Sequence, residues 1–136
     1  MDCYSLKNVS FSYPETTEKA LDGINLSVEA GDFLVLFGIS GCGKSTLLRL
    51  LKTALAPHGL LSGQISFFGQ ELAQIDSRTQ TERIGFVSQS PDNQIVCDKV
   101  WHELAFGLES LGAPQGVIRS RVAEISAFLF LFPLTR

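Results

Sequence analysis

Hydrophobic residues occupy every second position in two runs within the first thirty residues. They are Val9, Phe11 and Tyr13 in the first run, and Ile24, Leu26 and Val28 in the second. Alternation with a period of two gives a strand one apolar face and one face in water. Antiparallel sheets are the kind that commonly keep one face wet. We therefore predict two antiparallel strands, with turns at Pro14 and at Asp22-Gly23.

A different pattern begins at residue 33, where five consecutive positions are apolar. A strand without a polar face suits a parallel sheet that helices cover on both sides. A glycine-rich loop follows at once. Residues 46–55 then carry leucine and alanine at helical spacing, and Pro57 and Gly59 end the pattern. Strand, loop and helix are therefore expected in that order.

The rest of the chain is expected to add two short strands and two helices. Residues 65–67 and 84–87 have the apolar pattern of strands. Beyond Pro91 the spacing of apolar residues becomes helical, with a break at Gly112 and Pro114. The first helical stripe consists of Val100, Trp101, Leu104, Ala105, Leu108 and Leu111, and the second of Ile118, Val122, Ile125 and Leu129.

The composition is typical of a folded protein. The chain of 136 residues has the size of a single domain, with 45% hydrophobic and 18% charged residues. The net charge of -3 leaves no basic footprint, so we expect no nucleic-acid partner. Three cysteines without a C-x-x-C pair favour reduced thiols in the cytosol. We see neither a signal peptide nor an apolar run long enough to span a bilayer, so any membrane role would depend on a partner.

Residues 38–45 satisfy the phosphate-binding pattern G-x-x-x-x-G-K-[ST]. Glycines permit backbone conformations that a Cβ obstructs, so successive N–H groups can surround phosphate oxygens. The lysine brings a compact positive charge to the β- and γ-phosphates, and the serine hydroxyl is a ligand for Mg²⁺. We expect Thr46 to cap an α-phosphate oxygen and the Cys42 side chain to point outward. The predicted ATP site comprises Gly38, Ile39, Ser40, Gly41, Cys42, Gly43, Lys44, Ser45 and Thr46. A chance match in a glycine-rich turn is the alternative, which the flanking strand and helix disfavour.

Five segments in this order resemble the N-terminal half of an ABC transporter ATP-binding subunit. They are residues 4–13, 20–24, 38–51, 63–69 and 87–89. Residues 91–96 (PDNQIV) and 100–107 (VWHELAFG) are similar to the energy-coupling-factor (ECF) subgroup, whose members power the uptake of vitamins or transition-metal ions.

The resemblance implies an α/β fold with a P-loop NTPase (RecA-like) core, an N-terminal antiparallel β subdomain and the start of a helical subdomain. The C-terminal half of that fold would be missing. In this partial ATP-binding domain, residues 1–30 and 62–70 would form the β part, and residues 31–61 and 83–90 the P-loop core. Residues 91–136 would form the incomplete helical part.

The resemblance also implies roles for residues outside the loop. In the family, an aromatic residue at the position of Tyr13 stacks on adenine. The alternative is that Tyr13 is an ordinary aromatic residue at the end of a strand. Gln89 matches the Q-loop glutamine, which contacts Mg²⁺ or orients water, so the expected Mg²⁺ ligands are Ser45 and Gln89. Read alone, Gln89 would belong to an ordinary polar loop. We expect Trp101 and Phe106 in the core of the helical layer, with a groove for a short helix of a membrane subunit as the alternative.

Three parts that the family needs for hydrolysis are not found in the sequence: the Leu-Ser-Gly-Gly-Gln signature, an acidic strand end and a histidine near the γ-phosphate. Residues 61–64 (LSGQ) precede Gln89 and lack one glycine, so we interpret them as the lead-in to a strand. Residues 128–132 could form the missing strand, but Pro133-Leu134 stand where two acids are needed. Enzymatic activity therefore stays open, because no general base activates water. We hypothesise a truncated or frameshifted reading frame and expect a poorly soluble isolated chain, because unpaired apolar edges associate.

The leading interpretation is an ATP-binding subunit of an importer, with ATP and Mg²⁺ bound. Its expected partners are transmembrane subunits of the importer and a second ATP-binding subunit or domain. Through them it would lie on the cytoplasmic face of the cell membrane. The alternative is a non-hydrolytic nucleotide-binding module or pseudo-subunit. A P-loop GTPase is disfavoured by the lack of an Asn-Lys-x-Asp guanine reader, and a DNA-repair ATPase by the acidic balance.

Overall fold

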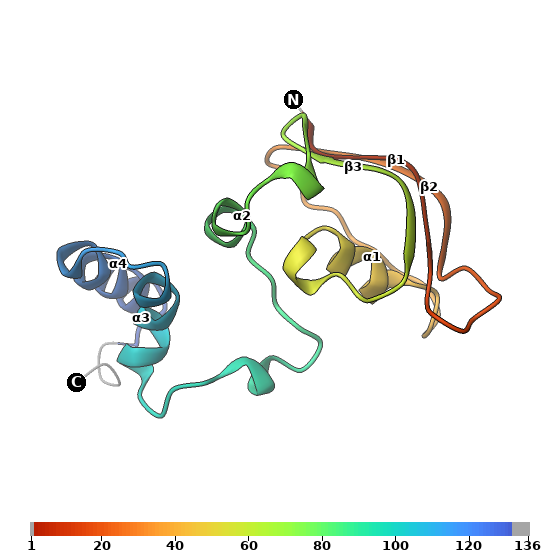
Figure 1. Cartoon of the computed structure of the whole chain (residues 1–136). Helices are drawn as coiled ribbons and strands as arrows, with labels where there is room; N and C mark the ends of the chain where they lie inside the picture. Colours follow the sequence, from red (N-terminus) through yellow and green to blue (C-terminus); the bar gives the residue numbers. More distant parts are fainter. Residues whose placement is uncertain (1, 132–136) are drawn as a thin grey trace. The chain divides into compact units, whose positions relative to one another are not determined.

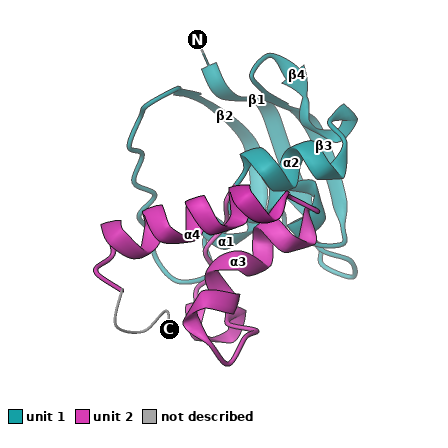
Figure 2. Ribbon diagram, turned by 90° about the vertical axis from the view of Figure 1, so that its left-hand side faces the viewer, with its two compact units in different colours: residues 1–84 teal, residues 85–136 magenta. Residues whose placement is uncertain are grey.

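The computed structural model describes residues 2–131, and the chain divides into two compact units. Unit 1 comprises residues 1–84 and unit 2 residues 85–136 (Figure 2). Each unit has its own cluster of buried hydrophobic side chains. The expectation for Pro133-Leu134 lies outside the described residues.

Unit 1 is built on an antiparallel sheet with the strand order β2-β1-β3-β4. The strands are β1 (Asp2–Ser12), β2 (Leu21–Glu29), β3 (Leu60–Phe67) and β4 (Gln70–Glu71). Val9 and Phe11 lie on the buried face of β1, as a period of two requires. The two strands predicted from alternation are therefore confirmed, and the third begins five residues earlier than the predicted residues 65–67.

The helices of unit 1 pack against one side of this sheet. They are α1 (Lys44–Leu50) and α2 (Ser77–Arg83), with short 3₁₀ turns η1 (Thr53–Leu55) and η2 (Leu72–Gln74). Helix α1 lies on the concave side of the sheet (Figure 1), and its Leu47 and Leu50 share one core with Phe11 and Ile65. The helix predicted over residues 46–55 therefore ends at Leu50, and its last residues form η1 instead.

Helix α2 was not predicted, although the sequence carries a signal for it. Asp76 is its N-cap, and the carboxylate accepts a hydrogen bond from the Thr79 backbone N–H at 2.9 Å. The helix buries one polar residue, Gln80, which makes four hydrogen bonds. Its amide oxygen accepts from the backbone N–H and the hydroxyl of Thr53, and its amide nitrogen donates to two carbonyls of the η2 segment, those of Leu72 and Ile75. Gln80 therefore joins η1, η2 and α2.

Residues 33–37 and 84–87 form no strand, so the buried strand predicted at residues 33–37 and the short strand predicted at residues 84–87 were both wrong. Phe33 and Phe37 leave 93% and 92% of their surface exposed. A strand that is apolar on both faces needs paired neighbours for its N–H and C=O groups and helices over its faces. Among residues 2–131, no strand pairs with either segment. The parallel sheet is therefore not formed within the described chain.

Unit 2 contains a 3₁₀ turn and two helices. These are η3 (Pro91–Gln94), α3 (Val100–Ser110) and α4 (Gln115–Phe128), so both helices predicted from apolar spacing are confirmed. The helices meet through Ala105, Ile118 and Val122, which are buried. Trp101 packs against this cluster, in agreement with the expected core position.

Three of the apolar residues expected in the helical core are in part exposed. Phe106 leaves 47% of its surface exposed, and Ile125 and Leu129 leave 39% and 50%. The buried stripe of α4 instead follows a spacing of four from Ile118 through Val122 to Ser126. A spacing of four is one of the two that keep residues on one helical face, and Ile118 and Val122 on this face pack against Ala105 of α3.

Candidate nucleotide-binding site

Residues 38–43 form a loop that leads into α1, and two of its glycines are required by geometry. Gly41 and Gly43 have φ values of 85° and 91°, in the left-handed region that side chains with a Cβ rarely adopt. A Cβ on Gly43 would lie 2.4 Å from the carbonyl oxygen of Ala20. The glycine at this position therefore lets the loop pack directly on the segment that enters β2.

The ammonium group of Lys44 points back into the loop. It donates to the carbonyl oxygens of Gly38 and Ile39 at 2.8 and 2.7 Å, and it lies 3.4 Å from the sulfur of Cys42. Cys42 is exposed, but its sulfur contacts the Lys44 ammonium and does not point away from the loop, contrary to the expectation. A lysine ammonium has three donors and no acceptor, so an anion in the loop can replace these carbonyls as its partner. A phosphate oxygen carries a negative charge that attracts the ammonium, whereas a carbonyl oxygen is neutral. The exchange therefore favours phosphate.

The N-terminus of α1 presents unused donors. Gly43 is the N-cap, no side chain caps the first turn, and the first turn holds no acidic residue. The first N–H groups of a helix lack partners within the helix and carry a partial positive charge. Ser45 is exposed in this turn, whereas Thr46 is buried. The turn can therefore receive an anion, with the Ser45 hydroxyl accessible beside it.

The structure brings Tyr13 to this loop from 33 positions away in the sequence. Its hydroxyl lies 2.8 Å from the hydroxyl of Thr46, and either oxygen can be the donor. The Tyr13 ring meets the ring of Phe11 edge to face, with centroids 5.0 Å apart. An aromatic ring and a phosphate-binding loop thus lie side by side within unit 1.

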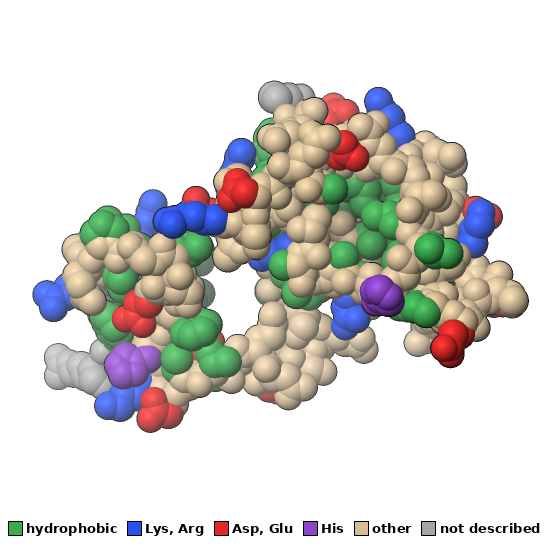
Figure 3. Space-filling view, viewed as in Figure 1, with side chains coloured by type: hydrophobic (Ala, Val, Ile, Leu, Met, Phe, Trp, Pro, Cys, Tyr) green, Lys and Arg blue, Asp and Glu red, His purple; other side chains and the backbone are tan. Residues whose placement is uncertain are grey.

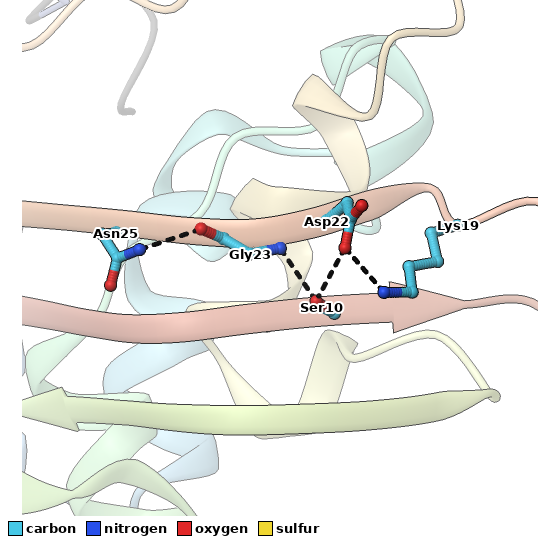
Figure 4. A network of polar contacts seen from close by, with 5 residues as sticks. All are labelled: Ser10, Lys19, Asp22, Gly23 and Asn25. Carbon is cyan, nitrogen blue, oxygen red and sulfur yellow. Dashed lines mark hydrogen bonds and ion pairs between the residues drawn. The ribbon is translucent and has the colours of Figure 1, made fainter.

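A polar network lies near the end of β1, which Tyr13 follows, and the start of β2, which follows Ala20. The network consists of Ser10, Lys19, Asp22, Gly23 and Asn25 (Figure 4). Lys19 donates to the Asp22 carboxylate at 2.6 Å, and this hydrogen bond and charge lower the pKa of Asp22. The Gly23 backbone N–H donates to the Ser10 hydroxyl at 2.8 Å, and the Asn25 side chain donates to the Gly23 carbonyl at 2.9 Å. The bond between Gly23 and Ser10 ties β2 to β1 where the register shifts.

Gln89 lies in an exposed segment of unit 2, whereas Ser45 belongs to unit 1. The segment around Gln89 is held by Gln94, a residue that the sequence pattern did not indicate. The Gln94 amide oxygen accepts from the Ser88 backbone N–H at 2.8 Å, and its nitrogen donates to the Phe86 carbonyl at 3.4 Å. A shared Mg²⁺ site of Gln89 and Ser45 stays a prediction.

Residues 61–64 lie in β3, as their interpretation as the lead-in to a strand requires. Gly63 has a φ of 87° and sits where the register between β1 and β3 shifts. A Cβ on Gly63 would lie 2.3 Å from the carbonyl oxygen of Asn8. The glycine of this LSGQ segment is therefore explained by strand geometry alone.

Two features are absent from residues 2–131. No cluster of three or more His, Cys, Asp or Glu side chains there could hold a metal ion. None of the helices in that range has the length and apolar character needed to cross a membrane.

Comparison with known proteins connects the chain to one family. Residues 21–128 match the sequence model of the family described as ABC transporter. An ABC transporter ATP-binding protein of Bacillus anthracis is 44% identical over 124 residues, which are 91% of this chain and 22% of the relative. An energy-coupling factor transporter ATP-binding protein of Symbiobacterium thermophilum is 42% identical over 111 residues, or 77% of this chain and 36% of the relative.

A solved structure agrees with these sequence matches. It is cbiO1 from Clostridium perfringens, described as part of the ABC transporter complex cbiONQ, with a TM-score of 0.81 and 28% identity. The alignment covers 98% of this chain and 53% of that one. The chain thus spans about half the length of the solved protein and 22% of the length of the Bacillus relative.

Proposed function

From the premise that this chain belongs to the ABC transporter family, we propose that it binds MgATP as part of an ATP-binding subunit of an ECF-type importer. The family match over residues 21–128 confirms the membership inferred from sequence motifs. The α/β fold class is confirmed as well, as a portion of an ABC ATPase domain.

The observation that carries the proposal is the meeting of a phosphate-binding loop with an aromatic ring. Lys44 closes the loop, and Tyr13 is hydrogen-bonded to Thr46 at the start of α1. Nucleotides combine a polyanion with a flat base, so a site for them needs N–H and ammonium donors next to a stacking surface. Unit 1 offers both, the ammonium through Lys44 and the ring through Tyr13.

The residues of the loop fit MgATP by their chemistry. Lys44 would pair with the β- and γ-phosphates, and the first N–H groups of α1 would hold the remaining oxygens. Bound Mg²⁺ would neutralise phosphate charge, held by the Ser45 hydroxyl and the Gln89 amide oxygen. Both are the hard oxygen donors that this ion prefers. Tyr13 would stack on adenine.

The importer part of the proposal rests on the relatives. One is named as an energy-coupling factor transporter subunit and another as part of the transporter complex cbiONQ. We infer transmembrane subunits and a second ATP-binding subunit or domain as partners, and a position on the cytoplasmic face of the membrane through them. Hydrophobic side chains that reach the surface in both units (Figure 3) provide apolar area for such contacts.

Calorimetric titration with MgATP tests the nucleotide site. Lys44→Ala should weaken binding about tenfold or more, because hydrogen bonds to charged groups contribute about 1.5–3 kcal/mol. The control is Lys7→Ala, which removes an exposed lysine of β1 and should leave the affinity as it is. Circular dichroism checks that both variants are folded. Equal affinity of folded Lys44→Ala and the unchanged protein would refute the site.

A phosphate-release assay on the same samples separates the two classes of function left open by the sequence. Release that depends on Lys44 supports an ATPase subunit. Tight binding of MgATP without release favours the non-hydrolytic module.

A further inference from the structure

The main chain just before Gln89 is held by the side chain of Gln94. The Gln94 amide oxygen accepts a hydrogen bond from the Ser88 backbone N–H at 2.8 Å, and the amide nitrogen donates to the Phe86 carbonyl at 3.4 Å. No strand among residues 2–131 pairs with this segment. Main-chain N–H and C=O groups need partners, and here one carboxamide supplies a partner to each of the two. The main chain of residues 86–88 is therefore held by a single side chain.

A second contact restrains the main chain on the other side of Gln89. The Ser88 hydroxyl donates to the Ser90 carbonyl at 3.0 Å and so spans Gln89. The same carbonyl accepts a hydrogen bond from the Asn93 backbone N–H at 3.1 Å, where Ser90 is the N-cap of η3. Gln94 is the last residue of η3. The chain from Ser88 through η3 to Gln94 is thus closed into a small hydrogen-bonded loop, and Gln89 lies within it.

The Gln89 side chain, in contrast, is free. Gln89 is exposed, and its amide makes no hydrogen bond with any group of residues 2–131. A primary amide offers one acceptor oxygen and two N–H donors, so this side chain has its full capacity left for a ligand. A main chain that is ordered before binding loses less conformational entropy when the ligand arrives. The loop therefore combines a restrained main chain with an available amide.

We propose that Gln94 is a positioning residue for Gln89, whose carboxamide holds residues 86–88 so that the Gln89 amide is presented to the ligand in a fixed place. The inference rests on the proposed function, in which the Gln89 oxygen is a ligand of the Mg²⁺ in MgATP. This ion demands near-ideal octahedral geometry, so a poorly placed oxygen is a poor ligand for it. Removing the Gln94 carboxamide should therefore weaken the binding of MgATP and spare the binding of ATP without metal.

The first measurement is hydrogen exchange of the Ser88 amide in the nucleotide-free protein. Gln94→Met keeps the approximate size of an exposed side chain and removes both bonds. Exchange at Ser88 should become about three- to tenfold faster, as expected for the loss of one hydrogen bond of ordinary strength. Gln94→Glu keeps an acceptor for the Ser88 N–H and should retain most of the protection. Gln74→Met is the matched control: it removes an exposed amide bonded to Glu71 in unit 1 and should leave Ser88 exchange as it is.

The second measurement is calorimetric titration with two probes, MgATP and ATP in excess EDTA. Gln89→Leu removes the proposed ligand, and Gln94→Met removes its support. Each should weaken MgATP about three- to tenfold and leave the affinity for metal-free ATP unchanged. The double variant should lose no more than Gln89→Leu alone, because Gln94 acts through Gln89. A merely structural role of Gln94 would lower both affinities and would add to the loss caused by Gln89→Leu.

The outcomes separate this inference from the proposed nucleotide site. Unchanged exchange of Ser88 in Gln94→Met would overturn the inference, and so would losses of MgATP affinity that add in the double variant. Unchanged MgATP affinity in Gln89→Leu would overturn it as well, whereas binding that depends on Lys44 would still support the nucleotide site. If the unaltered protein bound neither probe, the proposed function would be refuted together with the inference.

Discussion

Replacing Gln80 with glutamate would change the buried polar brace of unit 1 at almost constant volume. The Gln80 amide nitrogen donates to the carbonyls of Leu72 and Ile75 at 3.0 and 2.8 Å. Its oxygen accepts from the backbone N–H and the hydroxyl of Thr53 at 3.0 and 2.9 Å. Gln80→Glu keeps an acceptor for Thr53 but replaces the two donated hydrogens by oxygen lone pairs. Two buried carbonyls would then face a third oxygen.

The expected cost follows from these two carbonyls. A buried polar group that loses its partner costs about 1–3 kcal/mol, so Gln80→Glu should lower the free energy of unfolding by about 2–6 kcal/mol. Domains of this size are stable by about 5–15 kcal/mol, so the loss is a large share of the total. Burial would raise the pKa of the introduced carboxyl. Because the protonated form regains one donor, the variant should become more stable as the pH falls through that raised pKa.

Urea denaturation followed by circular dichroism at pH 8 and pH 5 measures both effects. The control is Gln64→Glu, the same chemical change at an exposed position of β3. Hydrogen exchange of α2 and η2 provides a local readout, and faster exchange there should accompany the global loss. If Gln80→Glu lay within about 0.5 kcal/mol of Gln64→Glu at pH 8, the scale of an ordinary surface substitution, the reasoning would be refuted.

Two further predictions concern backbone strain and tyrosine ionisation. Gly63→Ala should lower the thermal midpoint of unit 1 far more than Gly69→Ala. Both glycines have positive φ (87° and 78°). A Cβ on Gly63 would lie 2.3 Å from the Asn8 carbonyl oxygen, whereas a Cβ on Gly69 would meet nothing within 4 Å. Equal thermal midpoints of the two variants would therefore show that the predicted clash at residue 63 has no effect. Burial, followed by the charge of Cys3, raises the pKa of Tyr4 to about 12 from its usual 10.0. The free energy of unfolding should therefore fall as the pH rises from 10 toward 12, since the unfolded tyrosine ionises first. Tyr4→Phe should abolish this fall in pH-dependent denaturation, and a Tyr4 that ionises near 10 in a spectrophotometric titration would exclude the effect.

The apolar pattern predicted local elements better than it predicted their pairing. Alternation around Val9 and Phe11 led to β1, because one half-buried face is enough to define an antiparallel strand. The run at residues 33–37 reads as a buried strand by its composition, yet it is irregular here. A strand apolar on both faces depends on neighbours from elsewhere in the chain, and its own sequence carries no information on whether they are present.

The amino-acid sequence by itself determined the phosphate-binding loop. Its glycines and Lys44 act through the conformation and donors of adjacent residues, and adjacent residues are what a sequence motif records. The tertiary structure alone decided that Tyr13 lies against Thr46 and that Gln80 reaches Thr53, 27 positions away. The packing of the sheet against α1 and α2 brings the groups in these bonds within 3 Å of each other. No local sequence pattern predicts such bonds, because the partners are far apart in the sequence.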